Sequence, residues 1–112
     1  MKASPLLKGT MPLLILSVLR RQELYGYQIA QHITAGSGSL FSPSEGALYP
    51  ALHKLETEGS LEATWRDSDR GPRRRYYRIT ESGLGRLAEH EVEWQAVAHG
   101  IGRLTAGERA GG

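Results

Sequence analysis

The sequence predicts an α+β fold that is mostly α, with three short helices, a two-stranded hairpin and a long last helix. Three observations predict this order. Apolar residues recur at helical spacing in three segments before residue 58. Over residues 61–66, apolar and polar residues then alternate, which is the period of a half-buried strand. Turn residues over 67–72 separate that strand from a β-rich run over 75–79, and helical spacing returns from residue 81 to about residue 99.

The first two helices are indicated by apolar residues that share one face. The first begins after Thr10 as its N-cap, and Arg20 and Arg21 suit its last turn, where the helix dipole favours cations. The second runs from about residue 26 to residue 34, and the Gly-Ser stretch over 36–39 ends it. The residues expected to face inward are Met11, Leu14, Ile15, Val18 and Leu19 in the first helix and Ile29, Ala30 and Ile33 in the second.

The third helix has the clearest start signal in the chain. Ser42 is expected to cap it, and Pro43 takes the first helical position, where its missing N–H costs nothing. Glu45 completes an S-x-x-E capping box. Gly59 ends the helix, whose inward face consists of Leu48, Leu52 and Leu55.

The opposite face of this third helix is small and flat near its N-terminal half, where a solvated face would carry long charged side chains. A proline inside a helix costs about 3 kcal/mol or more. Pro50 therefore favours a shape requirement on an exposed binding face, and a neutral kink is the alternative. The free N–H groups at residues 42–45 favour a phosphate. The residues of this face are Gly46, Pro50, His53, Lys54 and Thr57, with Ala47 and Tyr49 at its margins.

Charge is unevenly distributed along this near-neutral chain. The 112 residues carry a formal net charge of +2. Five arginines and no acidic residue lie in one short stretch, across the tip of the predicted hairpin. Such a local cationic patch favours a polyanion partner, and a solvated basic hairpin is the alternative. The five are Arg70, Arg73, Arg74, Arg75 and Arg78.

Several classes of function find no support in the residues. The sequence has no cysteine, which excludes disulfides, thiolate metal sites and a catalytic thiol. The histidines fall in different predicted elements without a paired catalytic or metal-binding spacing, so we expect no cofactor, no metal and no enzyme activity. The strongest apolar run, over 13–16, is too short to span a membrane. We therefore expect a cytoplasmic protein with no membrane partner.

The last helix carries apolar residues at heptad spacing. A domain of three short helices and a hairpin cannot bury all of it, so we expect a second copy to cover this seam in a twofold homodimer. Folding back onto its own domain is the alternative. A large aromatic, Trp94, at the seam suggests contact with a small planar aromatic effector, and interface packing is the alternative. The seam consists of Leu87, His90, Trp94, Val97, Ile101 and Leu104.

The order of elements is that of a winged helix-turn-helix, in which the third helix enters the DNA major groove and the hairpin, or wing, lies along the backbone. Specific strings strengthen this prediction. L-Y-P-A-L-H-K-L-E over 48–56 and R-Y-Y-x-I-T-x-x-G over 75–83 resemble the PadR-like transcriptional regulators. K-G-T followed by L-L-I-L near the start, and Y-G-Y with a nearby isoleucine, add to the resemblance.

The resemblance implies a dimeric, cytoplasmic, DNA-binding regulator, commonly a repressor. In such proteins the C-terminal helix makes the dimer, and some members release DNA when a small aromatic or drug-like effector binds. The short C-terminal part resembles the small subfamily with a single dimerisation helix. Carried over by position, the recognition helix is matched by Tyr49, Pro50, His53 and Lys54, the start of the preceding helix by Tyr27 and Gln28, and the wing by Arg73, Arg74 and Arg75.

The sequence thus predicts a homodimeric repressor that binds double-stranded DNA at an inverted-repeat operator. A winged-helix module for ligand sensing or protein interaction, with only non-specific DNA affinity, is the alternative. The expected boundaries are a DNA-binding domain over 9–80, a dimerisation helix over 81–104 and a disordered tail over 105–112. To the matched positions we add Ser42, Ser44 and Arg70 as expected DNA contacts.

Overall fold

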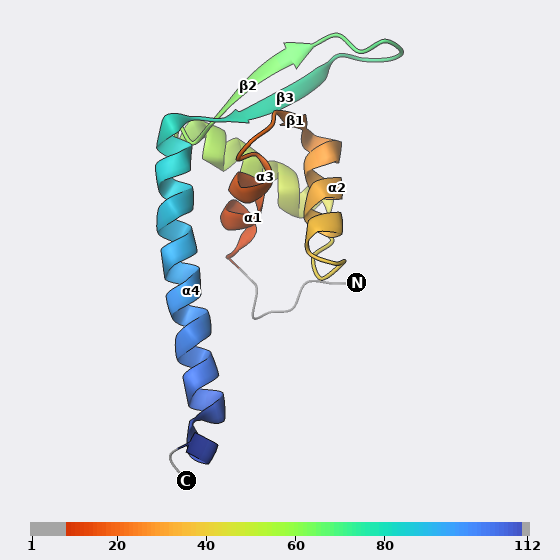
Figure 1. Ribbon diagram of the computed structural model, residues 1–112. Coiled ribbons are helices and arrows are strands. Elements are labelled where there is room, and N and C mark those ends of the chain that lie inside the picture. Colours follow the sequence, from red (N-terminus) through yellow and green to blue (C-terminus); the bar gives the residue numbers. More distant parts are fainter. Residues whose placement is uncertain (1–8, 111–112) are drawn as a thin grey trace.

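The computed structural model describes residues 9–110 and confirms a mostly helical α+β fold. The short helices and a small sheet form one body, and the last helix runs down one side of this body and beyond it (Figure 1). The molecule is therefore elongated, with principal dimensions of 62 × 31 × 21 Å. The elements are α1 (Met11–Val18), β1 (Leu24–Tyr25), α2 (Gly26–Gly36), α3 (Glu45–Thr57), β2 (Leu61–Arg66), β3 (Arg74–Ile79) and α4 (Glu81–Ala110).

The predicted hairpin forms, and a third short strand joins it. β2 and β3 pair antiparallel from Leu61 opposite Ile79 to Arg66 opposite Arg74. β1 pairs with the other edge of β3, so the strand order is β1-β3-β2. The sequence pattern does not predict β1, because two residues carry no period of their own and the strand exists only through its pairing.

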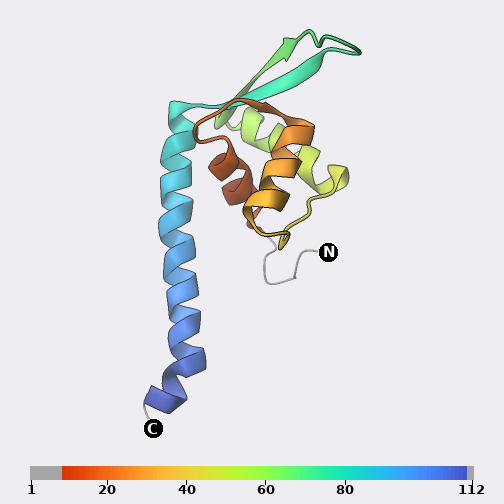
Figure 2. The same ribbon diagram turned by 45° about the vertical axis from the view of Figure 1, so that its right-hand side comes forward.

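One apolar core lies between the three short helices, the sheet and the start of α4. The inward face predicted for α3 is confirmed, since Leu48, Leu52 and Leu55 are all buried. Trp65 departs from the alternation predicted for its strand. It is exposed because β2 and β3 extend past the core at this end (Figure 2). The buried apolar residues are Ile15, Leu16, Leu19, Leu24, Ile29, Ile33, Leu48, Leu52, Leu55, Leu61, Tyr77, Ile79 and Leu87.

α3 begins later than the capping box predicts. Its N-cap is Ser44, whose hydroxyl oxygen accepts a hydrogen bond from the Ala47 N–H at 3.2 Å. Pro43 therefore precedes the helix and does not open it. The prediction based on Ser42 is wrong because Ser44 offers the same cap and leaves Glu45 in the first turn. There its carboxylate meets the positive end of the helix dipole.

α4 begins tightly against the body. Thr80 caps it, and its hydroxyl oxygen accepts a hydrogen bond from the Gly83 N–H at 3.0 Å. The same hydroxyl donates to the Gly59 carbonyl at 2.6 Å, which fastens the helix start to the turn after α3. A Cβ atom at Gly83 would collide with the backbone carbonyl of Ser60. Only a glycine allows this close approach.

The loop after α1 makes a further contact between the body and α4. α1 ends at Val18, so Arg20 and Arg21 lie beyond its last turn, contrary to the prediction. Instead of serving the helix dipole, Arg20 reaches across to α4 and pairs with Glu91 at 2.5 Å. The ribbon of α4 continues well beyond the body (Figures 1 and 2).

The far end of α4 differs from the prediction. The helix continues to Ala110 and does not end near His99. The predicted disordered tail is therefore wrong over 105–110, and residues 111–112 lie outside the described residues. Glycines lower helix stability by about 1 kcal/mol each but do not end a helix as proline does, and no proline interrupts this segment.

Candidate nucleic-acid interface

α3 presents a continuous exposed face opposite its buried leucines. The predicted contact residues on the helix, Tyr49, Pro50, His53 and Lys54, are all exposed there. Ser44 at the N-cap and Ser42 just before it are exposed as well. These side chains are available for binding because three leucines hold the other side of the helix in the core.

The helix runs without a break through Pro50. A proline has no N–H, so the Gly46 carbonyl one turn earlier receives no hydrogen bond from it. Both residues are exposed, which lets water satisfy that carbonyl. The absence of a side chain at Gly46 and the ring of Pro50 together leave a shallow, rigid patch on the exposed face.

Tyr49 lies between the exposed face and the body. Its hydroxyl and ring edge occupy the space beside Gly26, where a Cβ atom would come within 2.5 Å of the tyrosine oxygen. The glycine at the start of α2 therefore allows the Tyr49 side chain to lie directly against the backbone of Gly26. Partial burial, and then the negative charge of Glu45, raise the pKa of Tyr49 above its ordinary value. The hydroxyl remains protonated at neutral pH and can donate a hydrogen bond to an acceptor such as a phosphate oxygen.

The two residues predicted on α2 differ in their surroundings. Tyr27 is largely exposed. Gln28 is half-buried, and its carboxamide oxygen accepts a hydrogen bond from the Tyr25 N–H at 3.3 Å, which caps α2. Tyr27 is therefore available to a partner, whereas the Gln28 oxygen already serves the start of its own helix.

The wing carries three arginines whose side chains are open to a partner. Arg70 lies exposed at the tip of the hairpin. Arg73 is exposed and only 3.5 Å from the Asp67 carboxylate, an ion pair in open water that is worth little. The Arg74 guanidinium lies 4.5 Å above the Tyr25 ring, a cation–π contact that leaves its outer face free.

Arg75, the fourth predicted wing residue, is placed differently. It pairs with Glu56 of α3 at 2.6 Å, and its side chain is 33% exposed against 62% for Arg73. Burial disfavours its charged form, but hydrogen bonds to Tyr77 and to Glu56 outweigh burial and raise the pKa of Arg75. Its charge is committed to residues of the same chain.

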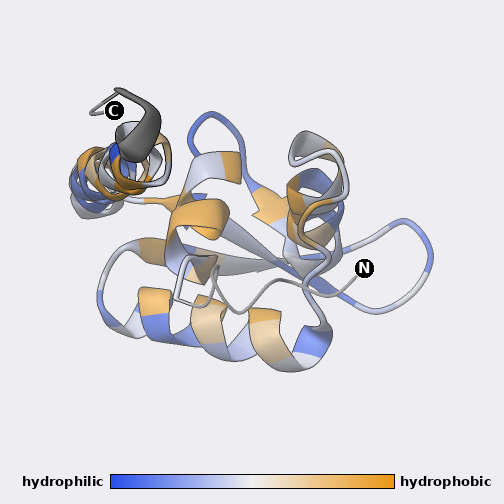
Figure 3. Cartoon of the chain, turned by 90° about the horizontal axis from the view of Figure 1, so that it is seen from below, coloured by the Kyte–Doolittle hydropathy of each residue, from blue (hydrophilic) through white to orange (hydrophobic). Residues whose placement is uncertain are grey.

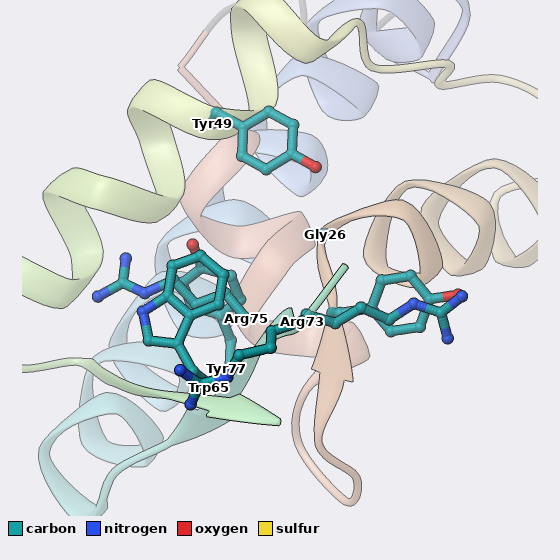
Figure 4. Close-up of a pocket in the computed structure, with 8 residues that line it drawn as sticks. Gly26, Tyr49, Trp65, Arg73, Arg75 and Tyr77 are labelled. Carbon is teal, nitrogen blue, oxygen red and sulfur yellow. The ribbon is translucent and has the colours of Figure 1, made fainter. Parts of the chain in front are cut away.

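A groove of about 390 Å³ separates α3 from the wing. In Figure 4, Tyr49 projects from α3 on one side, and Trp65, Tyr77 and Arg75 project from the sheet on the other. The structure thus brings the recognition helix and the wing arginines to one concave surface. The lining residues are Tyr25, Gly26, Tyr49, Trp65, Arg73, Arg74, Arg75 and Tyr77.

Four lining residues are absent from the predicted site: Tyr25, Gly26, Trp65 and Tyr77. Tyr25 enters through β1, which forms only by pairing with β3. Trp65 is predicted as strand packing from its alternation with polar neighbours. The exposure of Trp65 could have been recognised from its position in β2. It is the second-last residue of the strand, and only the other end of the strand reaches the core.

The seam of α4 divides into a buried start and an exposed remainder. Leu87 is buried in the core of its own domain, so its placement in a dimer seam is wrong. His90 is half-buried. Trp94, Val97 and Ile101 are exposed and, by their spacing, form a stripe along α4. Figure 3 shows this helix end-on beside the body.

Two other kinds of site are absent from the part of the chain that the structure describes. Residues 9–110 contain no group of three histidine or acidic side chains that could hold a metal ion. In the same range, no helix is both long enough and apolar enough to cross a membrane.

Comparison with known protein families gives one match that covers most of the chain. The model of the transcriptional regulator PadR-like family matches residues 15–89, which include α3, the wing and the start of α4. The chain belongs to the PadR-like family of transcriptional regulators. Members of this family are regulators and not enzymes, which confirms the absence of an enzyme function. The winged-helix fold predicted from the element order is confirmed as well.

Individual relatives agree with this assignment. The chain is 34% identical over 97 residues to the Uncharacterized protein X of Lysinibacillus sphaericus, covering 87% of this chain and 89% of that protein. It is 32% identical over 85 residues to the Negative transcriptional regulator PadR of Bacillus subtilis, covering 74% of this chain but 46% of that longer protein. A transcriptional regulator from Clostridium thermocellum superposes with a TM-score of 0.81 at 30% identity, covering 89% of this PadR-like chain and 97% of that structure.

Proposed function

We propose that this PadR-family chain is a sequence-specific DNA-binding repressor that acts as a homodimer on an inverted-repeat operator. One observation carries the proposal: Tyr49 of α3 lines the same groove as three arginines of the wing, Arg73, Arg74 and Arg75. A helix for the major groove beside a cationic hairpin for the backbone is the arrangement with which winged helices bind DNA.

The side chains divide by the contact that each can make. His53 and Lys54 lie on the exposed face and are proposed to contact bases or phosphates, beside the flat patch at Pro50. The start of α3 at Ser42 and Ser44 offers N–H groups and a positive dipole end to a phosphate. The neutral Tyr49 hydroxyl donates to a phosphate oxygen at the groove. Tyr27 flanks this face, and Gln28 supports it as the cap of α2.

The wing arginines supply the sequence-independent part of the affinity. Arg70, Arg73 and Arg74 are exposed and carry charge toward the backbone or the minor groove. Each phosphate that an arginine neutralises contributes about 0.9 to the slope of log K against log salt.

The exposed stripe of α4 supports the homodimer. Trp94, Val97 and Ile101, with His90 at their upper end, are exposed on the same helix face as Leu87 and would cover one another in a twofold pair. The same pairing would bring Trp94 to the interface, where its indole ring can contact a small aromatic effector. A repressor role is supported by the relative from Bacillus subtilis, whose name describes a negative regulator. A cytoplasmic location follows from action on DNA.

DNA binding is tested by fluorescence anisotropy with the duplex upstream of the chain's own gene. A scrambled duplex of equal length at physiological salt is the control. The proposal expects the upstream duplex to bind about a thousand-fold more tightly, with two protomers per duplex. Equal and weak binding to both duplexes would contradict it and would favour a protein-interaction module.

The homodimer is tested by sedimentation equilibrium of Val97→Asp, which places a charge in the exposed stripe. Val92→Asp is the matched control, because Val92 is also exposed on α4 but lies about 160° from Trp94 on a helical wheel. We expect Val97→Asp to shift the chain to monomers and Val92→Asp to leave the dimer intact. A monomeric wild type, or dissociation of both variants alike, would contradict the proposed seam.

The effector contact is tested with the chain's two tryptophans, Trp65 and Trp94. In the Trp65→Phe variant, Trp94 is the sole indole reporter. We expect 1-naphthol to quench the fluorescence of this variant and to leave that of Trp94→Phe unchanged. Quenching confined to Trp94→Phe would place the aromatic ligand at the wing instead.

A further inference from the structure

Arg75 is unlike the other arginines of the wing. It stands at the start of β3 beside Arg74, yet its guanidinium turns to α3 and pairs with Glu56. Glu56 is itself 25% exposed, so the contact lies at the edge of the body and not in open solvent. The guanidinium also lies 5.9 Å from the Trp65 ring centre and 5.7 Å from that of Tyr77.

The remaining polar atoms of the pair match each other. Glu56 Oε1 and Arg75 Nε are buried and lack a hydrogen-bond partner among the described residues. One is an acceptor and the other a donor. They are the atoms that complete a two-bond fork once Nη2 has bound Oε2, as it does here. The geometry is that of a carboxylate and a guanidinium placed for a side-on fork, which occupies the Nε and Nη2 edge of Arg75.

The pair joins α3 and the wing, which are 19 residues apart in the sequence at this contact. Glu56 closes the L-Y-P-A-L-H-K-L-E string of α3, and Arg75 opens the R-Y-Y string of the wing. In the pairing of β3 with β2, Arg75 stands opposite Trp65 near the hairpin's free end. A contact at this point controls the angle between the wing and α3.

We propose that Arg75 is a positioning residue, which through Glu56 sets the wing against the recognition helix and does not bind phosphate. This inference rests on the proposed function, because it concerns the geometry of the same DNA-binding surface. With Arg75 in this role, three wing arginines remain to contact the DNA backbone. The wing of each protomer then contributes about 2.7 to the salt slope, where four phosphate contacts would contribute about 3.6.

The test compares Arg75→Gln with the matched control Arg74→Gln by anisotropy at several salt concentrations, on the upstream and scrambled duplexes. For Arg74→Gln we expect equal loss on both duplexes and a salt slope lower by about 0.9 per protomer. For Arg75→Gln we expect an unchanged slope and an upstream-to-scrambled affinity ratio that falls about tenfold. Mere loss of folded protein would lower both affinities equally and leave this ratio unchanged.

Glu56→Gln supplies a test of opposite sign. If Arg75 positions the wing, loss of the carboxylate lowers the affinity ratio as Arg75→Gln does. If Arg75 binds phosphate, removal of a competing anion strengthens binding to both duplexes. Tighter binding by Glu56→Gln, a slope reduced in Arg75→Gln, or an unchanged affinity ratio in Arg75→Gln would each overturn the inference.

Urea unfolding separates failure of this inference from failure of the proposed function. The double variant of Glu56 and Arg75 should be no less stable than either single variant, because each single change already breaks the pair. Additive losses of stability would overturn the link between the two residues. If instead the wild type and Arg74→Gln bind both duplexes alike, the proposed sequence-specific DNA binding is wrong. The unfolding measurements still show whether Glu56 and Arg75 are coupled.

Discussion

The body of the molecule and the distal half of α4 bury their apolar residues to very different extents. In the body, helices, sheet and the start of α4 enclose a single core. Along α4, three seam positions seven residues apart change from buried to exposed. Leu87 is 2% exposed, Trp94 43% and Ile101 55%. The same heptad pattern therefore lies in an intramolecular core at one end and on an exposed surface at the other.

This difference shows what heptad spacing can and cannot establish. A seven-residue repeat places side chains on one face of a helix but does not identify what covers that face. The Arg20–Glu91 pair and the close approach of Gly83 bind the first part of α4 to the body. Beyond them the stripe is exposed in the single chain, and we propose that a second copy covers it.

The largest expected difference in stability is between two leucine-to-alanine variants, one in each region. Leu52→Ala empties a fully buried position and should lower the free energy of unfolding by about 3 kcal/mol. Leu104→Ala changes an exposed position in the distal half of α4 and should stay within about 0.5 kcal/mol. Urea unfolding at low protein concentration measures both.

The concentration dependence sharpens this contrast. At higher protein concentration Leu104→Ala should lose stability relative to the wild type, because unfolding is then linked to dissociation. An equal loss for both variants at every concentration would show that α4 packs on its own body along its whole length.

Two glycines of α4 offer the next largest contrast. An alanine at Gly83 collides with the Ser60 backbone, which no rotamer can relieve, so the free energy of unfolding should fall by about 1–3 kcal/mol. Gly100 has open space around it, and Gly100→Ala should raise stability by up to about 1 kcal/mol through helix propensity. Thermal unfolding monitored by circular dichroism reads both. Shifts of the same sign would contradict the assigned environments.

The smallest effect is expected where the two regions meet. Arg20 and Glu91 are 41% exposed on both sides, so solvent screens their attraction. Arg20→Ala should cost at most about 1 kcal/mol and should cost less as salt rises. Arg21→Ala, a change at the adjacent exposed arginine, is the control. A cost well above this range that persists at high salt would mean that the pair is a major attachment of α4.

Period and capping rules predict much of the fold. The inward faces of α2 and α3 follow from apolar spacing, and Thr80 is recognisable as a helix cap. The start of α3 is misplaced because Ser42 and Ser44 both satisfy local capping rules, and only the packed structure chooses between them. Local rules do not predict β1, because a two-residue strand depends wholly on tertiary pairing.

The candidate site divides in the same way. The exposed face of α3 is predictable because it is the complement of a buried face, and Tyr49, His53 and Lys54 lie where expected. The roles of the wing arginines are not predictable from charge alone. Arg73 and Arg75 have the same charge in the sequence, and only folding brings Glu56 to one of them.

The most direct measurement is hydroxyl-radical footprinting of the duplex upstream of the gene. We expect two protected patches related by a twofold axis, with centres about 10 base pairs apart, one for each α3 of the homodimer. A single patch, or uniform protection along the duplex, would contradict a dimeric regulator that places two recognition helices in successive major grooves.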